Sequence, residues 1–253
     1  MVEPGGSGLW VVMPVYNEAA AVRAVVEEWL PVLRRCAADV TLCVIDDGST
    51  DVTPSVLERL AREHGGLEVI TRTNTGHGRA CVYGYRLAIA RGARWILQID
   101  SDGQCDAAHF PELWRLRADH PLVFGVRRVR RDGWWRGQVS WLLALGAAAA
   151  SGIWVRDPNV PYRLMSSTAL RQVIDDVPDG VDLANVYVAV ALAARARIRW
   201  VDIVFRERLA GRSHRRWRSM IRPGLGVMAE LVRNRARVRG GGRETSRRRH
   251  PRT

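Results

Sequence analysis

The sequence has 253 residues, 47% of them hydrophobic and 26% charged, which is the composition of a soluble globular protein long enough to bury a full core. Its formal net charge of +13 comes entirely from arginine, and such a charge suits nucleic acid, anionic lipid headgroups or phosphorylated substrates alike. The cysteines at positions 36, 43, 81 and 105 form no CxxC pair, which argues against a zinc site or a redox motif and predicts reduced thiols in a cytosolic protein.

Residues 1–8 are predicted to form a disordered N-terminus without the basic and apolar regions of a signal peptide. After them, short apolar runs alternate with helical patterns. The predicted strands cover residues 9–15, 40–45, 67–70 and 95–99, and the predicted helices open at Tyr16, after the turn at 48–51, and at Arg79. Because strands that alternate with helices through short connections form a doubly wound sheet, this order predicts an α/β fold with a mostly parallel sheet and helices on both faces.

The fourth predicted strand ends in two aspartates one residue apart, in the stretch WILQIDSDGQ that closes at Gln104. Ligands of open α/β sheets bind beyond the carboxyl ends of the strands, which is where Asp100, Ser101 and Asp102 fall. Two carboxylates and an amide oxygen are hard ligands that suit Mg²⁺ or Mn²⁺ already held by a diphosphate. The alternative is an ordinary Asp-Gly turn after a strand, because DxD is a short and common string.

The second half of the chain is organised differently. Its predicted elements are a helix at 111–116, a strand at 122–126, a short strand within RDPNVPYRLM, helices at 170–174 and 186–194, a strand at 199–205 and a helix at 228–232. The apolar stretch 139–155 is shorter than the roughly 20 residues of a spanning helix, so we expect a buried or interfacial helix there. The folded domain is expected to cover residues 9–234, and the basic residues 235–253 a disordered tail.

Four motifs at the ends of successive predicted strands resemble those of family 2 glycosyltransferases of the GT-A fold. They are VVMPVYNE (11–18), VIDDGSTD (44–51), NTGHGRACVYG (74–84) and QIDSDGQ (98–104). The strings DPNVPYRLM and FRERLAGRSH are similar to those of the polyprenyl-phosphate branch, in which dolichyl-phosphate mannose synthase is the familiar member. The resemblance extends from about residue 9 to residue 220.

This resemblance implies a binding site for a nucleotide-sugar donor. The implied donor-binding residues are Pro14, Tyr16, Glu18, Ile45, Asp47, Asp100, Ser101, Asp102, Arg127, Arg208 and His214, of which Asp102, Arg127 and Arg208 would act in catalysis. The metal would be held by Asp100, Asp102 and Gln104. For Pro14 and Tyr16 the alternative is ordinary packing at the end of a strand, and for Asp47 it is a helix cap.

The resemblance also implies contacts with an acceptor phosphate, made by Arg127, Arg136, Ser140 and Arg163. A guanidinium group pairs bidentately with phosphate oxygens, which is the physical reason to expect arginine there. The alternative for each arginine is a solvated surface group in a very basic chain. His214 departs from the branch, which usually has lysine at this position, and a histidine is only partly charged near neutral pH.

An enzyme of this branch would move a hexose from a nucleotide sugar of the GDP-mannose or UDP-glucose type to polyprenyl phosphate, with inversion and with Mg²⁺ or Mn²⁺. The acceptor phosphate is already anionic at neutral pH, so no strong general base is needed. The implied partners are the nucleotide sugar, the polyprenyl phosphate, an anionic membrane surface and a separate membrane-anchor or flippase protein. The implied location is cytoplasmic, at the inner face of the membrane.

Two other functions are compatible with parts of the sequence. A GT-A transferase could use a soluble or polysaccharide acceptor in place of a lipid. A basic nucleic-acid-binding protein would use RRWR and RRRHPR against phosphates, but this function leaves the acidic motifs unexplained, and no specific nucleic acid is expected.

Overall fold

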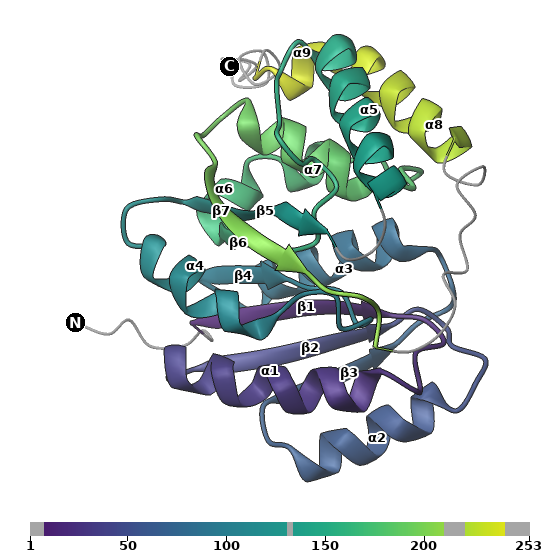
Figure 1. Ribbon diagram of the computed structural model, residues 1–253, viewed down its shortest axis with the longest axis vertical. Coiled ribbons are helices and arrows are strands. Elements are labelled where there is room, and N and C mark those ends of the chain that lie inside the picture. The colour runs from purple at the N-terminus through teal and green to yellow at the C-terminus, as the bar shows by residue number, and fades with distance from the viewer. Residues whose placement is uncertain (1–7, 131–133, 210–220, 241–253) are drawn as a thin grey trace, which may run out of the picture.

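The computed structural model describes residues 8–130, 134–209 and 221–240, apart from the side chains of residues 130 and 134–136 (Figure 1). Its strands are β1 (Leu9–Val15), β2 (Val40–Asp46), β3 (Leu67–Thr71), β4 (Trp95–Gln98), β5 (Leu122–Arg130), β6 (Arg163–Ser166) and β7 (Arg199–Phe205). Its helices are α1 (Val22–Cys36), α2 (Thr53–Glu63), α3 (His77–Ala90), α4 (Phe110–Leu116), α5 (Trp134–Ser151), α6 (Ser167–Arg171), α7 (Ala184–Ala193), α8 (Ile221–Arg233) and α9 (Arg235–Val238), with short 3₁₀ turns η1 (Ala107–His109) and η2 (Ile174–Asp176).

The strands form one sheet in the order β3-β2-β1-β4-β6-β5-β7. Strands β1 to β4 pair in parallel and β5 is parallel to β7, whereas β6 runs antiparallel to both β4 and β5. The predicted mostly parallel sheet is therefore confirmed, with one reversed strand that the apolar pattern did not indicate. Because β6 is reversed, the loop that precedes it arrives at the carboxyl edge of β4, where Gln98 pairs with Arg163.

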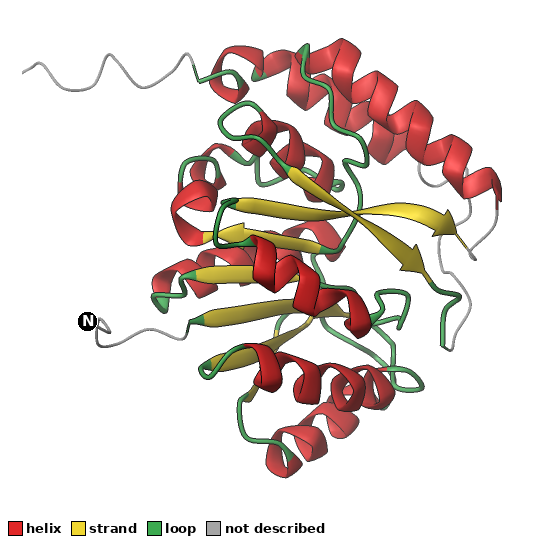
Figure 2. Ribbon diagram, turned by 60° about the vertical axis from the view of Figure 1, so that its left-hand side comes forward, coloured by secondary structure: helices red, strands yellow, loops and turns green. Residues whose placement is uncertain are grey.

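Helices cover both faces of the sheet, as predicted (Figure 2). Helices α1, α2 and α4 pack on one face, where Trp29 of α1 contacts the ring of Phe110 in α4. Helices α3, α6 and α7 pack on the other face. Every residue of β1 is buried, because a strand covered on both faces carries apolar side chains in both directions. Helix α7 is buried on nearly all sides, which explains why most of its residues are valine or alanine.

Helices α5 and α8 pack side by side at one end of the molecule, beyond α7 (Figures 1 and 2). Gly146 permits this close approach, since a Cβ atom there would lie only 3.3 Å from Cε of Met228. Helix α5 buries Ala144, Ala147 and Ala150 and leaves other residues exposed, which agrees with the predicted buried or interfacial helix. Within the described residues, no helix has both the length and the hydropathy needed to cross a bilayer.

Helix α1 begins at Val22, so the prediction that it opens at Tyr16 is wrong. Asn17 adopts a left-handed backbone conformation with φ of 53°, which interrupts a helix at that point. Its side-chain Oδ1 accepts hydrogen bonds from the backbone N–H groups of Thr50 (2.8 Å) and Asp51 (3.3 Å). The first motif is thus tied to the second, and residues 16–21 remain a loop at the edge of the sheet.

The ordered chain also extends beyond the predicted domain boundary at residue 234. Helix α9 follows α8, and Arg195 donates a hydrogen bond to the carbonyl oxygen of Val238 (3.1 Å). Arg239 Nε donates to the carbonyl oxygen of Ser151 (2.9 Å). Residues 235–240, which were predicted to belong to the disordered tail, are therefore part of the folded domain, and residues 241–253 lie outside the described residues.

Candidate active site

The two aspartates among the three predicted metal ligands lie just beyond β4, at the carboxyl edge of the sheet, in a turn that we call the acid loop (Asp100–Cys105). Gly103 gives this loop its sharp turn, with a backbone φ of 77° that side chains disfavour. Asp102 is buried, and the side chain of Asp100 is 26% exposed. The acid pair therefore stands where a ligand of an α/β sheet is expected.

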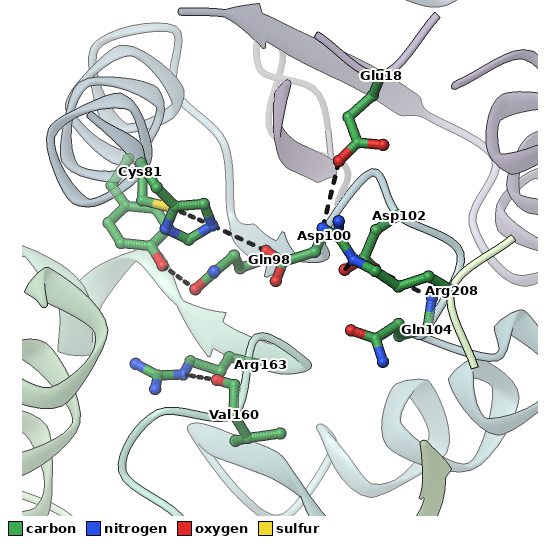
Figure 3. A network of polar contacts seen from close by, with 11 residues as sticks. Glu18, Cys81, Gln98, Asp100, Asp102, Gln104, Val160, Arg163 and Arg208 are labelled. Atoms are coloured by element: carbon green, nitrogen blue, oxygen red, sulfur yellow. Dashed lines mark hydrogen bonds and ion pairs between the residues drawn. The ribbon is translucent and has the colours of Figure 1, made fainter. Parts of the chain in front are cut away.

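Arg208 joins two carboxylates that are far apart in the sequence (Figure 3). Its Nε donates to Asp102 Oδ2 (3.0 Å), and its Nη2 donates to Glu18 Oε1 (3.2 Å). Glu18 comes from the loop after β1, whose position is fixed by a hydrogen bond from the Glu18 N–H to Thr53 Oγ1 (3.0 Å). Three predicted donor-site residues therefore meet at one point.

The segment that carries Arg208, which we call the clamp (Phe205–Leu209), runs antiparallel to the acid loop. The N–H of Arg206 donates to the carbonyl oxygen of Gln104 (3.0 Å), and the N–H of Leu209 donates to that of Asp102 (3.1 Å). An isolated antiparallel bridge pairs the last residue of the acid loop with Phe205. The acid loop and the clamp thus form a single unit, although they belong to different halves of the chain.

Arg206 anchors the clamp to the helices on the α1 side of the sheet. Its guanidinium group contacts Glu28 of α1 and lies 3.1 Å from Asp106 Oδ1. The side chain of Gln104, the predicted third metal ligand, is also used by the clamp, because its Nε2 donates to the carbonyl oxygen of Arg206 (3.0 Å). Gln104 therefore supports the acid loop through its nitrogen.

His77, the first residue of α3, contacts the acid loop from the opposite side. Its Nε2 lies 3.0 Å from Asp100 Oδ1. Burial alone would lower the pKa of His77, but the adjacent Cys81 and Asp100 raise this pKa well above its ordinary value. Burial would raise the pKa of Asp100, whereas the charge and hydrogen bond of His77 hold it below its ordinary range. The two side chains are therefore held as an ion pair.

The other two carboxylates of the site hold their protons more tightly than usual. Burial and the negative charge of Asp100 raise the pKa of Asp102, against the opposing effect of Arg208. Burial raises the pKa of Glu18 to about 7, again against Arg208 and with the help of Asp102 and Asp100. Besides burial, the charges of neighbouring carboxylates contribute to both shifts, and a bound cation would relieve this repulsion.

The donor atoms of the acid loop suit a hard divalent cation. Asp100 and Asp102 offer carboxylate oxygens, the ligands that Mg²⁺ and Mn²⁺ prefer beside a diphosphate. Asp102 Oδ1 accepts from the N–H of Gln104 (3.1 Å) and its Oδ2 from Arg208, so a guanidinium group supplies positive charge at this point. No cluster of three or more histidine, cysteine or acidic side chains is arranged as a metal site in the described part of the chain. The two aspartates could hold an ion whose other ligands come from diphosphate and water.

Arg127, at the end of β5, is engaged by a carboxylate that the sequence analysis did not single out. Its Nε and Nη2 donate to the two oxygens of Asp157 (2.8 and 2.6 Å), and its Nη2 lies 3.4 Å from Ser140 Oγ. The side chains of Arg127 and Asp157 are only 8% and 7% exposed. The structure therefore brings Arg127 and Ser140 together, with Asp157 as the partner of the guanidinium fork.

Arg163 does not face the site, because it lies fully buried in the interior (Figure 3). It donates hydrogen bonds to the carbonyl oxygens of Asn185 (2.7 Å), Pro158 (2.6 Å) and Val160 (2.6 Å). Burial lowers its pKa. The predicted contact with an acceptor phosphate is replaced by a structural role, since Arg163 fixes the loop that presents Asp157.

The predicted nucleotide pocket is only partly assembled from side chains. Pro14 and Ile45 are paired neighbours on β1 and β2, and both side chains are buried in the sheet. Tyr16 follows them and is 41% exposed at the edge. Pro14 and Ile45 thus pack within the sheet at the ends of their strands, whereas the ring of Tyr16 is accessible to a ligand.

Asp47 is buried at the same edge and holds the loop before α3. Its Oδ1 accepts from the N–H of Thr75 (3.0 Å) and its Oδ2 from the N–H of Gly76 (2.7 Å). This carboxylate is therefore not a helix cap of α2, and it links the second motif to the third. Ser101, another predicted donor residue, is buried within the acid loop.

Two predicted residues receive no structural test. Arg136 lies in the first turn of α5, but its side chain is not described, and His214 lies outside the described residues. The structure adds His77 and Asp157 to the site. Both could have been found in the sequence, because His77 follows two closely spaced small residues at a helix start and Asp157 opens the DPN string.

Comparison with known proteins identifies the family. The sequence model described as glycosyl transferase family 2 matches residues 10–177, which is more than half of the chain. The chain belongs to glycosyl transferase family 2. This glycosyltransferase is 27% identical over 168 residues to the undecaprenyl-phosphate mannosyltransferase of Micrococcus luteus, a match that covers 64% of the chain and 68% of the relative.

A second group of relatives is longer. The glycosyltransferase is 27% identical over 168 residues to the undecaprenyl-phosphate 4-deoxy-4-formamido-L-arabinose transferase of Aeromonas hydrophila. This match covers 65% of the chain and 49% of the relative, so the chain spans about half the length of that protein.

Solved structures confirm the predicted GT-A fold. The glucosyl-3-phosphoglycerate synthase of Mycobacterium tuberculosis, in complex with Mn²⁺ and UDP-glucose, superposes with a TM-score of 0.69 at 20% identity, over 90% of this chain and 79% of that chain. The same synthase in complex with phosphoglyceric acid gives a TM-score of 0.68 at 21% identity, over 90% and 80% of the two chains. At this level of identity the likeness establishes the fold alone.

Proposed function

We propose that this glycosyltransferase moves a hexose from a nucleotide sugar of the UDP-glucose or GDP-mannose type to polyprenyl phosphate, with inversion and with Mg²⁺ or Mn²⁺. The observation that carries the proposal is the meeting of Glu18, Asp102 and Arg208 beside Asp100 at the carboxyl edge of the sheet. The relatives support the acceptor, since those named above are undecaprenyl-phosphate transferases. The solved synthase supports a UDP-linked donor and Mn²⁺.

The reaction is a displacement in which an oxygen of the acceptor phosphate forms a bond to the anomeric carbon. The bond between that carbon and the nucleotide diphosphate breaks, and its electron pair leaves with the diphosphate. Asp100 and Asp102 would hold a divalent ion, which would supply charge neutralisation to this leaving group. Arg208, which lies against Asp102, adds a guanidinium group to the same anion when the diphosphate takes over its hydrogen bonds.

The acceptor phosphate approaches from the side of Arg127. The pairing with Asp157 fixes the plane of this guanidinium group, and preorganised cations stabilise developing charge without the cost of reorientation. Ser140 adds a hydroxyl at the same place. Arg136 is retained as a predicted contact of the acceptor phosphate, and His214 as a predicted donor-binding residue. Because the acceptor is already an anion, the role of these residues is to hold two negatively charged substrates together.

A lipid acceptor places the enzyme at a membrane surface. We propose a peripheral location at the inner face of the membrane, where a separate membrane-anchor or flippase protein would act beside it. A specific nucleic-acid partner is not proposed, because it would leave the acid loop and its contacts with Arg208 without a role.

The test is transfer from labelled donors by the purified protein. We expect UDP-glucose or GDP-mannose, with undecaprenyl phosphate and Mn²⁺ or Mg²⁺, to give a labelled product that is extracted into organic solvent and is lost when the ion is chelated. Asp102→Asn should lower the rate by at least about a hundredfold. The matched control is Asp119→Asn, an exposed aspartate after α4. If neither UDP-glucose nor GDP-mannose gave a product, the proposal would be contradicted.

A soluble acceptor is the second candidate, and the complex of the synthase with phosphoglyceric acid favours it. The same assay distinguishes the two acceptors, because a product made with 3-phosphoglycerate or a polysaccharide stays in the aqueous phase. If transfer to phosphoglycerate exceeded transfer to the lipid, the acceptor would be a soluble molecule, and the proposed donor chemistry would stay unchanged.

A further inference from the structure

We propose that the exposed sides of α5 and α8 form one docking surface for an anionic lipid bilayer. We call this surface the α5–α8 face and define it by Trp141, Leu142 and Leu145 of α5 and Ile221, Leu225 and Val232 of α8. The inference rests on the proposed function, because a polyprenyl phosphate acceptor is held in a membrane.

The α5 part of the surface is a stripe of large apolar side chains. Trp141, Leu142 and Leu145 are 55%, 59% and 45% exposed, and their spacing puts them on one side of the helix. The opposite side of α5 is buried through small residues such as Ala144 and Ala147. Among its described side chains, α5 therefore presents its tryptophan and two of its three leucines outward, the reverse of the pattern of an ordinary surface helix.

Helix α8 repeats this arrangement. Ile221, Leu225 and Val232 are 51%, 67% and 58% exposed, and the intervals of four and seven residues place them on one side. Val227 and Leu231 are buried and attach α8 to the rest of the domain. Six of the eleven exposed large hydrophobic residues in the described chain thus lie on these two helices, which concentrates them at one end of the molecule.

The charges around the surface match an anionic membrane. Helix α5 contains no acidic residue. Arg222 and Arg233 are exposed on α8, and Arg235 and Arg237 are exposed on the adjoining α9. Glu230 is the single carboxylate between Ile221 and Gly240, and it is paired with Arg233. Apolar side chains flanked by arginine are typical of an element that lies in the interface of a bilayer with anionic lipid.

The position of the surface agrees with a lipid acceptor. Helix α5 begins shortly after the end of β5, and Ser140 in its second turn contacts Arg127. In Figure 1 the two helices form an outer layer whose starting ends lie on the side toward which β5 and β7 point. A phosphate at the headgroup level could therefore reach the edge of the site while the isoprenoid chain stays in the bilayer.

A second copy of the chain fits this surface less well than a bilayer does. Two α5–α8 faces brought together would oppose arginine with arginine, and like charges repel at short distance. Among the described residues no helix can span the bilayer, so the contact is one in which both helices lie in the membrane plane.

The test is flotation of the full chain with lipid vesicles. We expect it to float with vesicles of phosphatidylglycerol and phosphatidylcholine, and to float at least about tenfold less with phosphatidylcholine alone or in high salt. Leu142→Glu combined with Leu225→Glu should weaken binding to the anionic vesicles by at least about tenfold. The matched control is Val52→Glu, because Val52 is 67% exposed and directly precedes α2, a helix at the opposite end of the molecule from α5 and α8 in Figure 1.

The catalytic readout separates this inference from the proposed function. The double variant should lose transfer to undecaprenyl phosphate in vesicles but keep transfer to a short, water-soluble isoprenyl phosphate. Equal flotation of the double variant and the Val52→Glu control would overturn the inference, and so would a wild-type dimer in light scattering that dissociates on the double substitution. Vesicle binding that depends on Leu142 and Leu225 without transfer to any isoprenyl phosphate would contradict the proposed function and leave the docking surface in place.

Discussion

At the scale of single residues, Arg208 provides positive charge at the point where two acidic segments meet. Its hydrogen bonds to Asp102 and Glu18 neutralise carboxylates that are largely out of contact with water, with side chains 8% and 11% exposed. A buried charge without a partner is strongly unfavourable, so the carboxylates and the guanidinium group stabilise one another. Arrival of a cation and a diphosphate would exchange these partners, which allows the same side chain to serve both states.

Glu18 gives the first prediction, a pH dependence of stability in the absence of ligands. Its pKa is raised from 4.5 to about 7, so the folded state binds this proton more tightly than the unfolded state does. The resulting stabilisation is fully present below pH 4.5 and is lost as the pH rises through about 7. Relative to Glu18→Gln, the wild-type free energy of unfolding should fall by something on the order of 3 kcal/mol between pH 4.5 and pH 8.

Urea denaturation at several pH values, with chelator present, measures this difference. Comparison with Glu18→Gln isolates the contribution of Glu18, because the histidines and the other acids titrate in both proteins. Their effects on the free energy of unfolding therefore cancel in the difference. A difference that stays constant, or that grows in favour of the wild type as the pH rises, would show that Glu18 is ionised in the folded protein.

The residues of the site were predicted from sequence to different degrees. Asp100 and Asp102 were predicted because they stand directly after an apolar strand, where the fold itself defines an edge, whereas Glu18 was implied only by the resemblance of its motif to family 2 glycosyltransferases. Arg163 was assigned to the wrong role because sequence does not distinguish an arginine that binds phosphate from one that binds three backbone carbonyl groups. Asp157 opens the DPN string but was not assigned a role, because the sequence does not show that it lies beside Arg127, which is 30 residues away.

At the scale of secondary structure, the contact between α3 and the segment before α7 positions His77. Gly78 lies at this contact, and a Cβ atom there would approach the carbonyl oxygens of Asp182 to 2.6 Å and of Val181 to 2.9 Å. Backbone atoms cannot move aside as the end of a side chain can. The start of α3 is therefore held in a place that only glycine permits.

The second prediction follows from this contact. Gly78→Ala should lower the free energy of unfolding by about 1–3 kcal/mol, the usual cost of overpacking, and should weaken donor binding through the shift of His77 against Asp100. Gly180→Ala is the control, because no atom lies within 4 Å of a Cβ at that position, and it should leave stability unchanged or raise it by up to about 1 kcal/mol. Urea denaturation and nucleotide titration measure both effects; equal stability of the two variants would contradict the prediction.

The elements themselves show which parts of a fold can be read from sequence. The four parallel strands of the first half were located almost to the residue, because strands buried on both faces are short, apolar and bounded by turns. The reversed direction of β6 was not indicated, since its direction depends on which neighbours it joins and not on its own residues. The late start of α1 was missed because the left-handed backbone of Asn17 depends on partners in the second motif.

At the scale of the whole molecule, a bound nucleotide should stabilise the entire domain. A ligand that binds only the folded state at about 100 times its dissociation constant adds about 2.7 kcal/mol to the free energy of unfolding, which is about 5–10 °C in the melting temperature of a domain of this size. This third prediction concerns UDP, GDP and their sugars with Mn²⁺ or Mg²⁺, measured as thermal shifts.

The metal dependence of this shift is the informative part. The shift should disappear with chelator and in a double variant, Asp100→Ala with Asp102→Ala, whereas Asp119→Asn should retain it. A nucleotide shift of the same size in the double variant would show that the acid loop does not take part in donor binding.

Because the acid loop pairs with the clamp, this part of the enzyme can be completed only late in its synthesis on the ribosome. Asp102 is translated 106 residues before Arg208, a delay of roughly 5 to 20 seconds at common rates of synthesis. During this interval the nascent polypeptide holds its acidic turn without the arginine that neutralises it. The family match to residues 10–177 also ends before the clamp, so a truncated product of that length would carry the recognisable signature and lack Arg208, the partner of Asp102.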